Sequence, residues 1–302
     1  MSDGVRPTLA ELVALRALVG GRRVPPRGRH GVHGHGLSPL RGRGMEYAES
    51  REYAHGDDAR HIDWRLTARS GRAHTKLFQA ERERLTLVVA DTAPALYFGT
   101  RVRFKSVQAA RAGAVAAWMA VRDGDRVAAL RGSADEAPVP PASGPRGALR
   151  VLDALVRWHG APPGDDAGLA FALDHAARLL RPGSRLVVLA DPASISGDGA
   201  AWPEAKWAGL ARHHEVTVVL LVDALERAPP PAQLVFAADG ERIELDLSVP
   251  GQRAAWARTF EGPVSDALDT LPARGVRVQV LATDAPSDAW VGAARQAPAR
   301  VA

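Results

Sequence analysis

Arginines and carboxylates alternate within one stretch of this 302-residue chain, and their types suit ion pairing. Between residues 42 and 83 the charged side chains follow no helical or strand period that would sort them onto one solvent-facing side. Arg can bind a carboxylate through two parallel hydrogen bonds, which Lys cannot do, so this mixture favours an interlocked network of pairs. The expected donors are Arg51, Arg60, Arg65 and Arg69, and the expected acceptors are Glu46, Asp57, Asp58 and Asp63.

The same block contains Tyr53 and Trp64, and each has two interpretations. An aromatic side chain can act as a local anchor that keeps water away from neighbouring ion pairs. It can equally be a docking residue, because Trp, Tyr and Arg dominate the energetics of protein interfaces. The arginines also have a purely structural interpretation, in which they tie this block to the rest of the chain. Loss of one partner from a dry pair would then cost roughly 3–5 kcal/mol.

The motifs of this block resemble the signature of the DUF58 family, bacterial proteins that carry a von Willebrand factor A-like domain. The matching residues are the GRG of 42–44, Glu46, the REY of 51–53, Gly56, Asp57, Asp58, Arg60, the IDW of 62–64, Ala68, Arg69, Glu81 and Glu83. The resemblance continues to about Asp284. It implies that the chain works with a MoxR-type AAA+ ATPase and with other von Willebrand A-domain proteins, in assembling, remodelling or activating proteins.

Beyond residue 84, apolar runs alternate with helical patterns, which predicts an α/β fold with a mainly parallel, Rossmann-like sheet covered on both faces. The predicted strands are 85–91, 125–131, 185–191, 215–223 and 276–284, with a hairpin over 234–247 that turns at Asp239 and Gly240. The predicted helices are 102–122, 146–159, 166–180, 203–213 and 251–273. Pro and Gly in 137–145 predict a linker.

Four segments follow from these patterns. Residues 1–40 are expected to form a helix over 7–19, with Leu9, Leu12, Val13 and Leu18 on one face, and then an arm rich in Gly, Arg and His. Residues 41–84 form the signature module of short strands and turns. Residues 85–284 form the von Willebrand A-like α/β domain, and residues 285–302 form a C-terminal helix or tail. The composition of the arm favours the alternative interpretation, a flexible linker.

Two acids, Asp91 and Asp191, follow predicted strands, where ligands of parallel sheets bind. The resemblance implies a divalent metal at this edge, held by an Asp-x-Ser-x-Ser loop and by a later Thr and Asp. Here both Ser positions of the loop from Asp91 are Ala, and Asp165 and Asp166 stand near the expected Thr. Hard oxygen ligands suit Mg²⁺, so Asp91 and Asp191 are candidate ligands of a degenerate site. Alternatively, they cap helices or bind backbone amides.

Sequence motifs of hydrolases, zinc proteases and nucleotide-binding loops are absent from the chain, which predicts a non-enzymatic interaction protein without a cofactor. Adjacent acids such as Asp57 and Asp58 point to opposite sides of an extended chain, which argues against a shared catalytic metal. One alternative is nucleic-acid binding through the basic arm over 22–43, although the net charge of +5 is modest. Another is a metal-dependent hydrolase built on the strand-end acids. His30, His33 and His35 are a further possible metal site on the arm.

The composition predicts a cytoplasmic protein. Cysteine is absent, which excludes disulfides and thiolate metal sites. No run of about twenty apolar residues exists to span a membrane. Asp3 and Glu11 interrupt the N-terminal pattern that a signal peptide would need.

Overall fold

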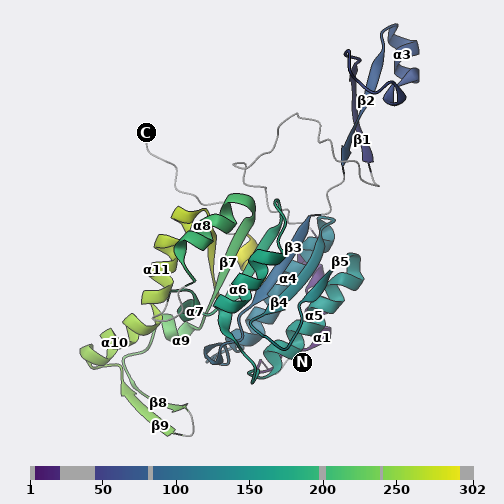
Figure 1. Cartoon of the computed structure of the whole chain (residues 1–302). Helices are drawn as coiled ribbons and strands as arrows, with labels where there is room; N and C mark the ends of the chain where they lie inside the picture. The colour runs from purple at the N-terminus through teal and green to yellow at the C-terminus, as the bar shows by residue number, and fades with distance from the viewer. Residues whose placement is uncertain (1–3, 21–44, 81–83, 197–201, 239–240, 293–302) are drawn as a thin grey trace. The chain divides into compact units, whose positions relative to one another are not determined.

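The computed structural model describes residues 4–20, 45–80, 84–196, 202–238 and 241–292, which belong to two compact units (Figure 1). The larger, which we call the α/β unit, comprises residues 1–30 and 84–302; the smaller, the signature unit, comprises residues 31–83. Each is described by itself. None of the described helices combines the length and apolar character that crossing a membrane requires.

A six-stranded sheet forms the centre of the α/β unit, in the order β10-β7-β6-β3-β4-β5. All strands run parallel except β5 at one edge. From β3 the chain builds outward to β4 and β5, then returns to the other side of β3 with β6, which is the order of a doubly wound sheet. The predicted fold class is therefore confirmed. The strands are β3 (Leu85–Ala90), β4 (Arg126–Arg131), β5 (Val139–Ser143), β6 (Arg185–Ala190), β7 (Glu215–Val222) and β10 (Arg277–Ala282).

Strand β5 lies where the sequence predicted a linker, so that prediction was wrong. Its residues Val139 and Ala142 pair antiparallel with β4, opposite Ala129 and Val127. Two prolines interrupt this strand, and proline has no N–H to donate to a ladder. Only an edge strand tolerates them, so the composition resembled a linker although the segment completes the sheet.

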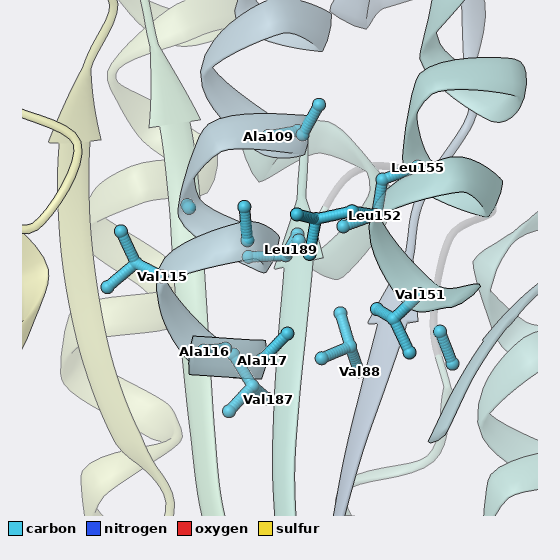
Figure 2. Packing of buried hydrophobic residues seen from close by; sticks show 14 of the residues in the cluster. Val88, Ala109, Val115, Ala116, Ala117, Val151, Leu152, Leu155, Val187 and Leu189 are labelled. Carbon is cyan, nitrogen blue, oxygen red and sulfur yellow. The ribbon is translucent and has the colours of Figure 1, made fainter. Parts of the chain in front are cut away.

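Helices cover both faces of the sheet, and alternate residues of each strand enter two separate cores. In β3, Val88 packs into one core and Leu87 and Val89 into the other. The first core contains α4 (Lys105–Arg122) and α5 (Gly144–Gly160), whose alanine, valine and leucine side chains meet over Val88, Val187 and Leu189 (Figure 2). The second core lies under α6 (Gly168–Leu179), α7 (Pro192–Ser196), α8 (Glu204–His213) and α11 (Gly262–Thr270). Burial on both faces explains the continuous apolar runs of the central strands.

Two predicted helices are each broken in two. The N-terminal one consists of α1 (Leu9–Ala14) and α2 (Arg16–Val19), and its buried residues are Leu12, Leu15 and Val19. The predicted face was wrong for Leu9, Val13 and Leu18, which are exposed. The face that packs onto the core is instead the i, i+3, i+7 set of Leu12, Leu15 and Val19. The helix predicted over 251–273 is likewise α10 (Pro250–Phe260) followed by α11, which restarts at Gly262.

The remaining described elements of the α/β unit are one hairpin and four short helical segments. The predicted hairpin is present as β8 (Gln233–Ala238) and β9 (Glu241–Asp246), with Phe236 opposite Ile243. Short helical segments complete the unit: η2 (Pro94–Leu96), α9 (Ala224–Arg227), η3 (Pro272–Arg274) and α12 (Ala289–Gly292).

The signature unit is an antiparallel pair of strands, β1 (Met45–Glu52) and β2 (His74–Ala80), joined by a helical connection. The connection contains η1 (Ala59–His61) and α3 (Trp64–Ser70). The sequence predicted strands and turns here, so α3 was missed. Its boundaries are nevertheless readable from the sequence, because Asp63 caps the N-terminus and Gly71 adopts a left-handed φ of 72° at the C-terminus.

Candidate functional site

Three acids meet at the carboxyl edge of the sheet. Asp91 follows β3, Asp191 follows the adjacent parallel strand β6, and Asp223 follows β7. Lys105, the first residue of α4, and Glu226 of α9 join them. We call these five residues the strand-end cluster; each is at most 5% exposed. The cluster lies beside the switch point between β3 and β6, where doubly wound sheets bind ligands.

Lys105 lies between two carboxylates. Its Nζ donates to Asp191 Oδ2 and to Glu226 Oε1, both at 2.6 Å. Burial by itself disfavours the ammonium, but the two carboxylates outweigh it and hold the pKa of Lys105 above its usual value. The cluster therefore contains a permanent internal cation. The sequence analysis missed Lys105 and Glu226, although a Lys at a helix N-terminus opposes the helix dipole and thereby signals a need for acidic partners.

Asp91 and Asp191 are bound to each other through the backbone. Asp91 Oδ2 accepts from the N–H of Asp191 at 3.0 Å, and its Oδ1 accepts from the N–H of Ala93 at 3.0 Å. Asp191 Oδ1 accepts from the N–H of Ala193 at 2.9 Å. Burial raises the pKa of Asp91 to about 6, although hydrogen bonds from Ser194 and from these amides counteract it. These contacts correspond to the alternative interpretation, in which both acids bind backbone amides.

Asp223 and Glu226 connect the cluster to neighbouring loops. Asp223 accepts from the hydroxyls of Thr100, at 2.5 Å, and Thr283, at 2.7 Å. Its own N–H donates to Glu226 Oε2 at 2.8 Å, which forms a capping box at the start of α9. Burial opposes ionisation of Asp223, but its hydrogen-bond donors lower the pKa of this carboxyl. The cluster is thus fixed by bonds from several elements of the fold.

The donor set of the cluster does not fit Mg²⁺. That ion requires oxygen ligands in a near-octahedral arrangement at about 2.0–2.1 Å. Here Asp91 uses both oxygens on backbone amides, and the oxygen of Asp191 that does not bind an amide holds the ammonium of Lys105. The part of the chain that the structure describes contains no group of three or more His, Asp or Glu placed to hold a metal.

Asp165 and Asp166, the acids near the expected Thr, are also engaged. Arg131 Nη2 donates to Asp165 Oδ1 at 2.7 Å and Oδ2 at 2.8 Å, and Ser133 donates at 2.5 Å. Asp166 accepts from the N–H of Gly168 at 2.9 Å. The charge of Asp165 is therefore neutralised by an arginine.

A cavity of about 640 Å³ opens above the cluster, with Lys105, Asp191 and Glu226 in its lining. The opposite walls come from the β8–β9 hairpin and α10 and carry Phe236, Ile243, Leu245, Trp256 and Phe260. The ring centroid of Trp256 is 5.6 Å from that of Phe236 and 4.5 Å from that of Phe260. Its Nε1 donates to the backbone oxygen of Glu226 at 3.1 Å, which ties the aromatic wall to the cluster.

The described part of the signature unit contains two short arginine–carboxylate pairs. Arg72 Nη1 lies 2.9 Å from Glu52 Oε1, and both of these side chains are exposed. The other pair is less exposed. Arg51 Nη2 lies 2.7 Å from Asp57 Oδ1, and Asp57 Oδ2 accepts from the N–H of Ala54 at 2.9 Å. The amide of Ala54, followed by Arg51, lowers the pKa of Asp57 despite some desolvation. Gly56, with φ of 106°, supplies the left-handed turn that brings Asp57 back toward β1.

Among the described residues, the other predicted arginines do not form the interlocked network that the sequence predicted. Arg60 lies 3.7 Å from Asp58, and both side chains are open to solvent, so this pair contributes little. Asp63 accepts from Leu66 N–H and Ser50 Oγ, both at 3.1 Å. Arg65 and Arg69 are exposed, because α3 turns both outward.

Several residues named from the sequence lie outside the described part of the chain. The side chain of Glu46 lies outside those the structure describes, although its backbone pairs with Gln79. The described residues also exclude the GRG of 42–44, Glu81, Glu83 and the arm beyond Gly20, with His30, His33 and His35.

The aromatic residues of the signature unit are accessible. Trp64 is 70% exposed and Tyr53 is 36% exposed. Neither is a buried anchor that shields the Arg51–Asp57 pair from water. The docking interpretation of Trp64 therefore has the better structural support.

This chain matches a protein family, several uncharacterized relatives and solved structures. A family model described as "Protein of unknown function DUF58" matches residues 49–262. Uncharacterized proteins of Mycobacterium tuberculosis, among them Rv1480, and of Mycobacterium bovis are 30% identical over 256 residues, which cover 84% of this chain and 79% of theirs. The structure is similar to the conserved hypothetical protein BatB from Bacteroides thetaiotaomicron, with a TM-score of 0.40, 13% identity, and coverage of 66% of this chain and 90% of BatB. An aerotolerance-related membrane protein from Bacteroides fragilis gives a TM-score of 0.37 at 15% identity, with coverage of 68% and 96%.

Proposed function

Because this chain belongs to the DUF58 family, we propose that it is a non-enzymatic adaptor that binds a MoxR-type AAA+ ATPase through its signature unit. The ATPase would supply nucleotide hydrolysis, and this chain would supply a recognition surface for assembly, remodelling or activation of other proteins. The observation that carries the proposal is the exposure of Trp64, 70% of whose surface is open to solvent.

The local structure holds Trp64 in place without burying it. Trp64 is the first residue of α3, and the preceding Asp63 caps that helix and binds Ser50 of β1. The Arg51–Asp57 pair fixes the loop that leads into η1 and α3. Because the backbone around Trp64 is already held in place, binding costs little further conformational entropy. A large exposed aromatic side chain in such a position favours an interface hot spot.

We expect Trp64→Ala to weaken binding of the ATPase at least tenfold, because truncation of a hot-spot residue costs about 2 kcal/mol or more. The measurement is a calorimetric titration of the MoxR-type ATPase from the same genome, loaded with an ATP analogue, into the full chain. Leu149→Ala is the matched control, since Leu149 is 40% exposed on α5 of the α/β unit. Equal affinities of wild type and Trp64→Ala would contradict a docking role, and no binding by the wild type would overturn the ATPase partnership.

Charge reversal at Arg60 should weaken the same association while leaving the fold intact. The side chain of Arg60 is 87% exposed and makes only a loose pair with Asp58, so Arg60→Glu removes little from the folded unit. Arg51→Glu, which breaks the short pair with Asp57, should in addition lower the melting temperature. An Arg60→Glu variant that unfolds, or that binds as wild type, would count against the proposal.

The competing functions give different outcomes in the same experiments. Nucleic-acid binding through the arm would show an affinity that falls steeply with salt, roughly as the number of phosphates contacted. Binding of the ATPase that changes little between low and physiological salt would favour the adaptor. A metal-dependent hydrolase draws no support from the cluster, where Asp91 binds two backbone amides and Asp191 binds one amide and the ammonium of Lys105.

A further inference from the structure

The cavity above the strand-end cluster is lined by residues of the α/β unit. We propose that it binds an extended segment of a partner polypeptide and takes up a Lys or Arg side chain of that segment against Asp191 and Glu226. This goes beyond the adaptor proposal, because the α/β unit would recognise a polypeptide independently of the ATPase.

The charge of the cavity floor favours a cation. Lys105 supplies one positive charge to two carboxylates in direct contact, so with both carboxylates ionised the three side chains carry one net negative charge. Burial raises the pKa of Glu226, and the ammonium of Lys105 counteracts this by favouring its ionised form. Asp91 and Asp223, which lie at the ends of the neighbouring strands, add further negative charge. A ligand with an anionic group would be repelled, and one with a cationic group would be complementary.

The two carboxylates that hold Lys105 can each accept another donor. Asp191 Oδ2 and Glu226 Oε1 each accept one bond from Nζ, and an ionised carboxylate oxygen offers about two lone-pair positions. A second ammonium or a guanidinium can thus bind without displacing Lys105. Both residues belong to the lining of the cavity.

The walls suit the aliphatic stem of a basic side chain. Phe98, Phe236, Trp256 and Phe260 line the cavity with aromatic rings. Lys and Arg bury their methylene stems along apolar surface while the charged group at the end of the side chain stays in a polar environment. A cation that passes the face of Trp256 would also gain a cation–π interaction.

The β8–β9 hairpin indicates a polypeptide rather than a free amine. It is a sheet of two strands, and in the described part of the chain neither outer edge pairs with a further strand. Unpaired edges present N–H and C=O groups that an extended chain can bind as an added strand. A two-stranded hairpin is also marginally stable alone, and its apolar face, with Phe236, Ile243 and Leu245, lines the cavity.

The size of the cavity agrees with this occupant. Its volume of about 640 Å³ lies within the range of ligand pockets, about 300–1,000 Å³, and so holds a few side chains rather than a folded element. Ile243, at the cavity, is 43% exposed, so the apolar face is only partly covered by the chain itself.

The first experiment varies the ligand and leaves the protein unchanged. The probes are short acetylated and amidated peptides in which one central Lys is flanked by Val, Leu or Phe in varied order. Each is paired with matched peptides that carry norleucine or Glu at the centre, and each is titrated into the full chain by calorimetry. We expect the best Lys peptide to bind about tenfold more tightly than its norleucine partner, and the Glu peptide to bind least.

The second experiment uses a matched pair of variants at one position. Ile243→Lys and Ile243→Glu remove the same apolar contact but place opposite charges at the cavity, so the first should weaken Lys-peptide binding further than the second. Val235→Lys is the control, because Val235 is 52% exposed and lies on the opposite face of the same hairpin. It should bind the Lys peptide as wild type does.

Three results would overturn the proposal. They are equal binding of the Lys and norleucine peptides, binding of pentylamine as tight as that of the best Lys peptide, and no binding by any peptide of the set. None of them bears on the Trp64 titration, so the two proposals fail independently.

Discussion

Replacing Lys105 with Met will lower the free energy of unfolding at pH 7 by about 3–5 kcal/mol, because it removes one partner of a buried ion pair and leaves the others uncompensated. The Nζ of Lys105 is 2.6 Å from both Asp191 and Glu226, and all three side chains are at most 6% exposed. Met keeps the length and apolar stem of Lys, so packing is largely retained. Urea unfolding of the purified chain, monitored by circular dichroism, measures the change.

The control for this prediction is a double variant, since neighbouring residues do not contribute additively. With Lys105→Met, adding Glu226→Gln removes one of the two unpaired charges, and the new amide can donate to Asp191. We therefore expect the double variant to be more stable than Lys105→Met alone, although Glu226→Gln in the wild type should be destabilising. If the two changes simply add, the ammonium does not hold these carboxylates together.

An internal ammonium also bears on how the strand-end cluster is used. The resemblance implies metal-dependent recognition at this edge of the sheet, in which Asp191 would be a ligand. Here Asp191 Oδ2 is held by Lys105, a cation that is part of the chain. Recognition at this edge should therefore proceed without added divalent metal, and chelators should leave it unchanged.

The sequence predicted those features that depend on local pattern or on shared strand ends. Continuous apolar runs identified β3, β6 and β7 because strands buried on both faces carry few polar residues. The proximity of Asp91 and Asp191 was also predictable, since adjacent parallel strands end at the same edge. Strand β5 was missed because its prolines resemble a linker, which only its place at the sheet edge permits.

Long-range pairing was the part that the sequence could not supply. Lys105 and Glu226 are 121 positions apart, and the sequence around each residue does not indicate which residue it pairs with. Arg51 and Asp57 are six positions apart, within reach of a single turn, and the sequence identified both as candidates for pairing without assigning them to each other. For Arg65 and Arg69 the prediction failed because it did not include α3, which decides where their side chains point.

Replacing His159 with Leu should stabilise the chain, and by a larger amount as the pH falls from 7 to 4. His159 of α5 is fully buried, and neither ring nitrogen has a hydrogen-bond partner in the described structure. An unsatisfied buried polar group costs about 1–3 kcal/mol, so a Leu of similar size should raise the free energy of unfolding even at pH 7.

The pH dependence follows from two buried groups that act in opposite directions. Burial lowers the pKa of His159 to about 4, so between pH 4 and 6.5 the unfolded chain binds the extra proton and the native state loses stability as the pH falls. Burial raises the pKa of Asp91 to about 6, so between pH 3.8 and 6 the native state binds the extra proton and loses stability as the pH rises. These two contributions therefore oppose each other between pH 4 and 6.

The variant removes only the first slope. Its advantage over the wild type should grow by about 3 kcal/mol as the pH falls from 7 to 4, because each unit of pKa shift corresponds to about 1.4 kcal/mol. Urea unfolding at a series of pH values measures both curves, and His213→Leu, at an exposed position of α8, controls for the loss of an imidazole. A constant difference between variant and wild type across this range would show that His159 is protonated alike in the folded and unfolded chain, against the burial that the structure gives it.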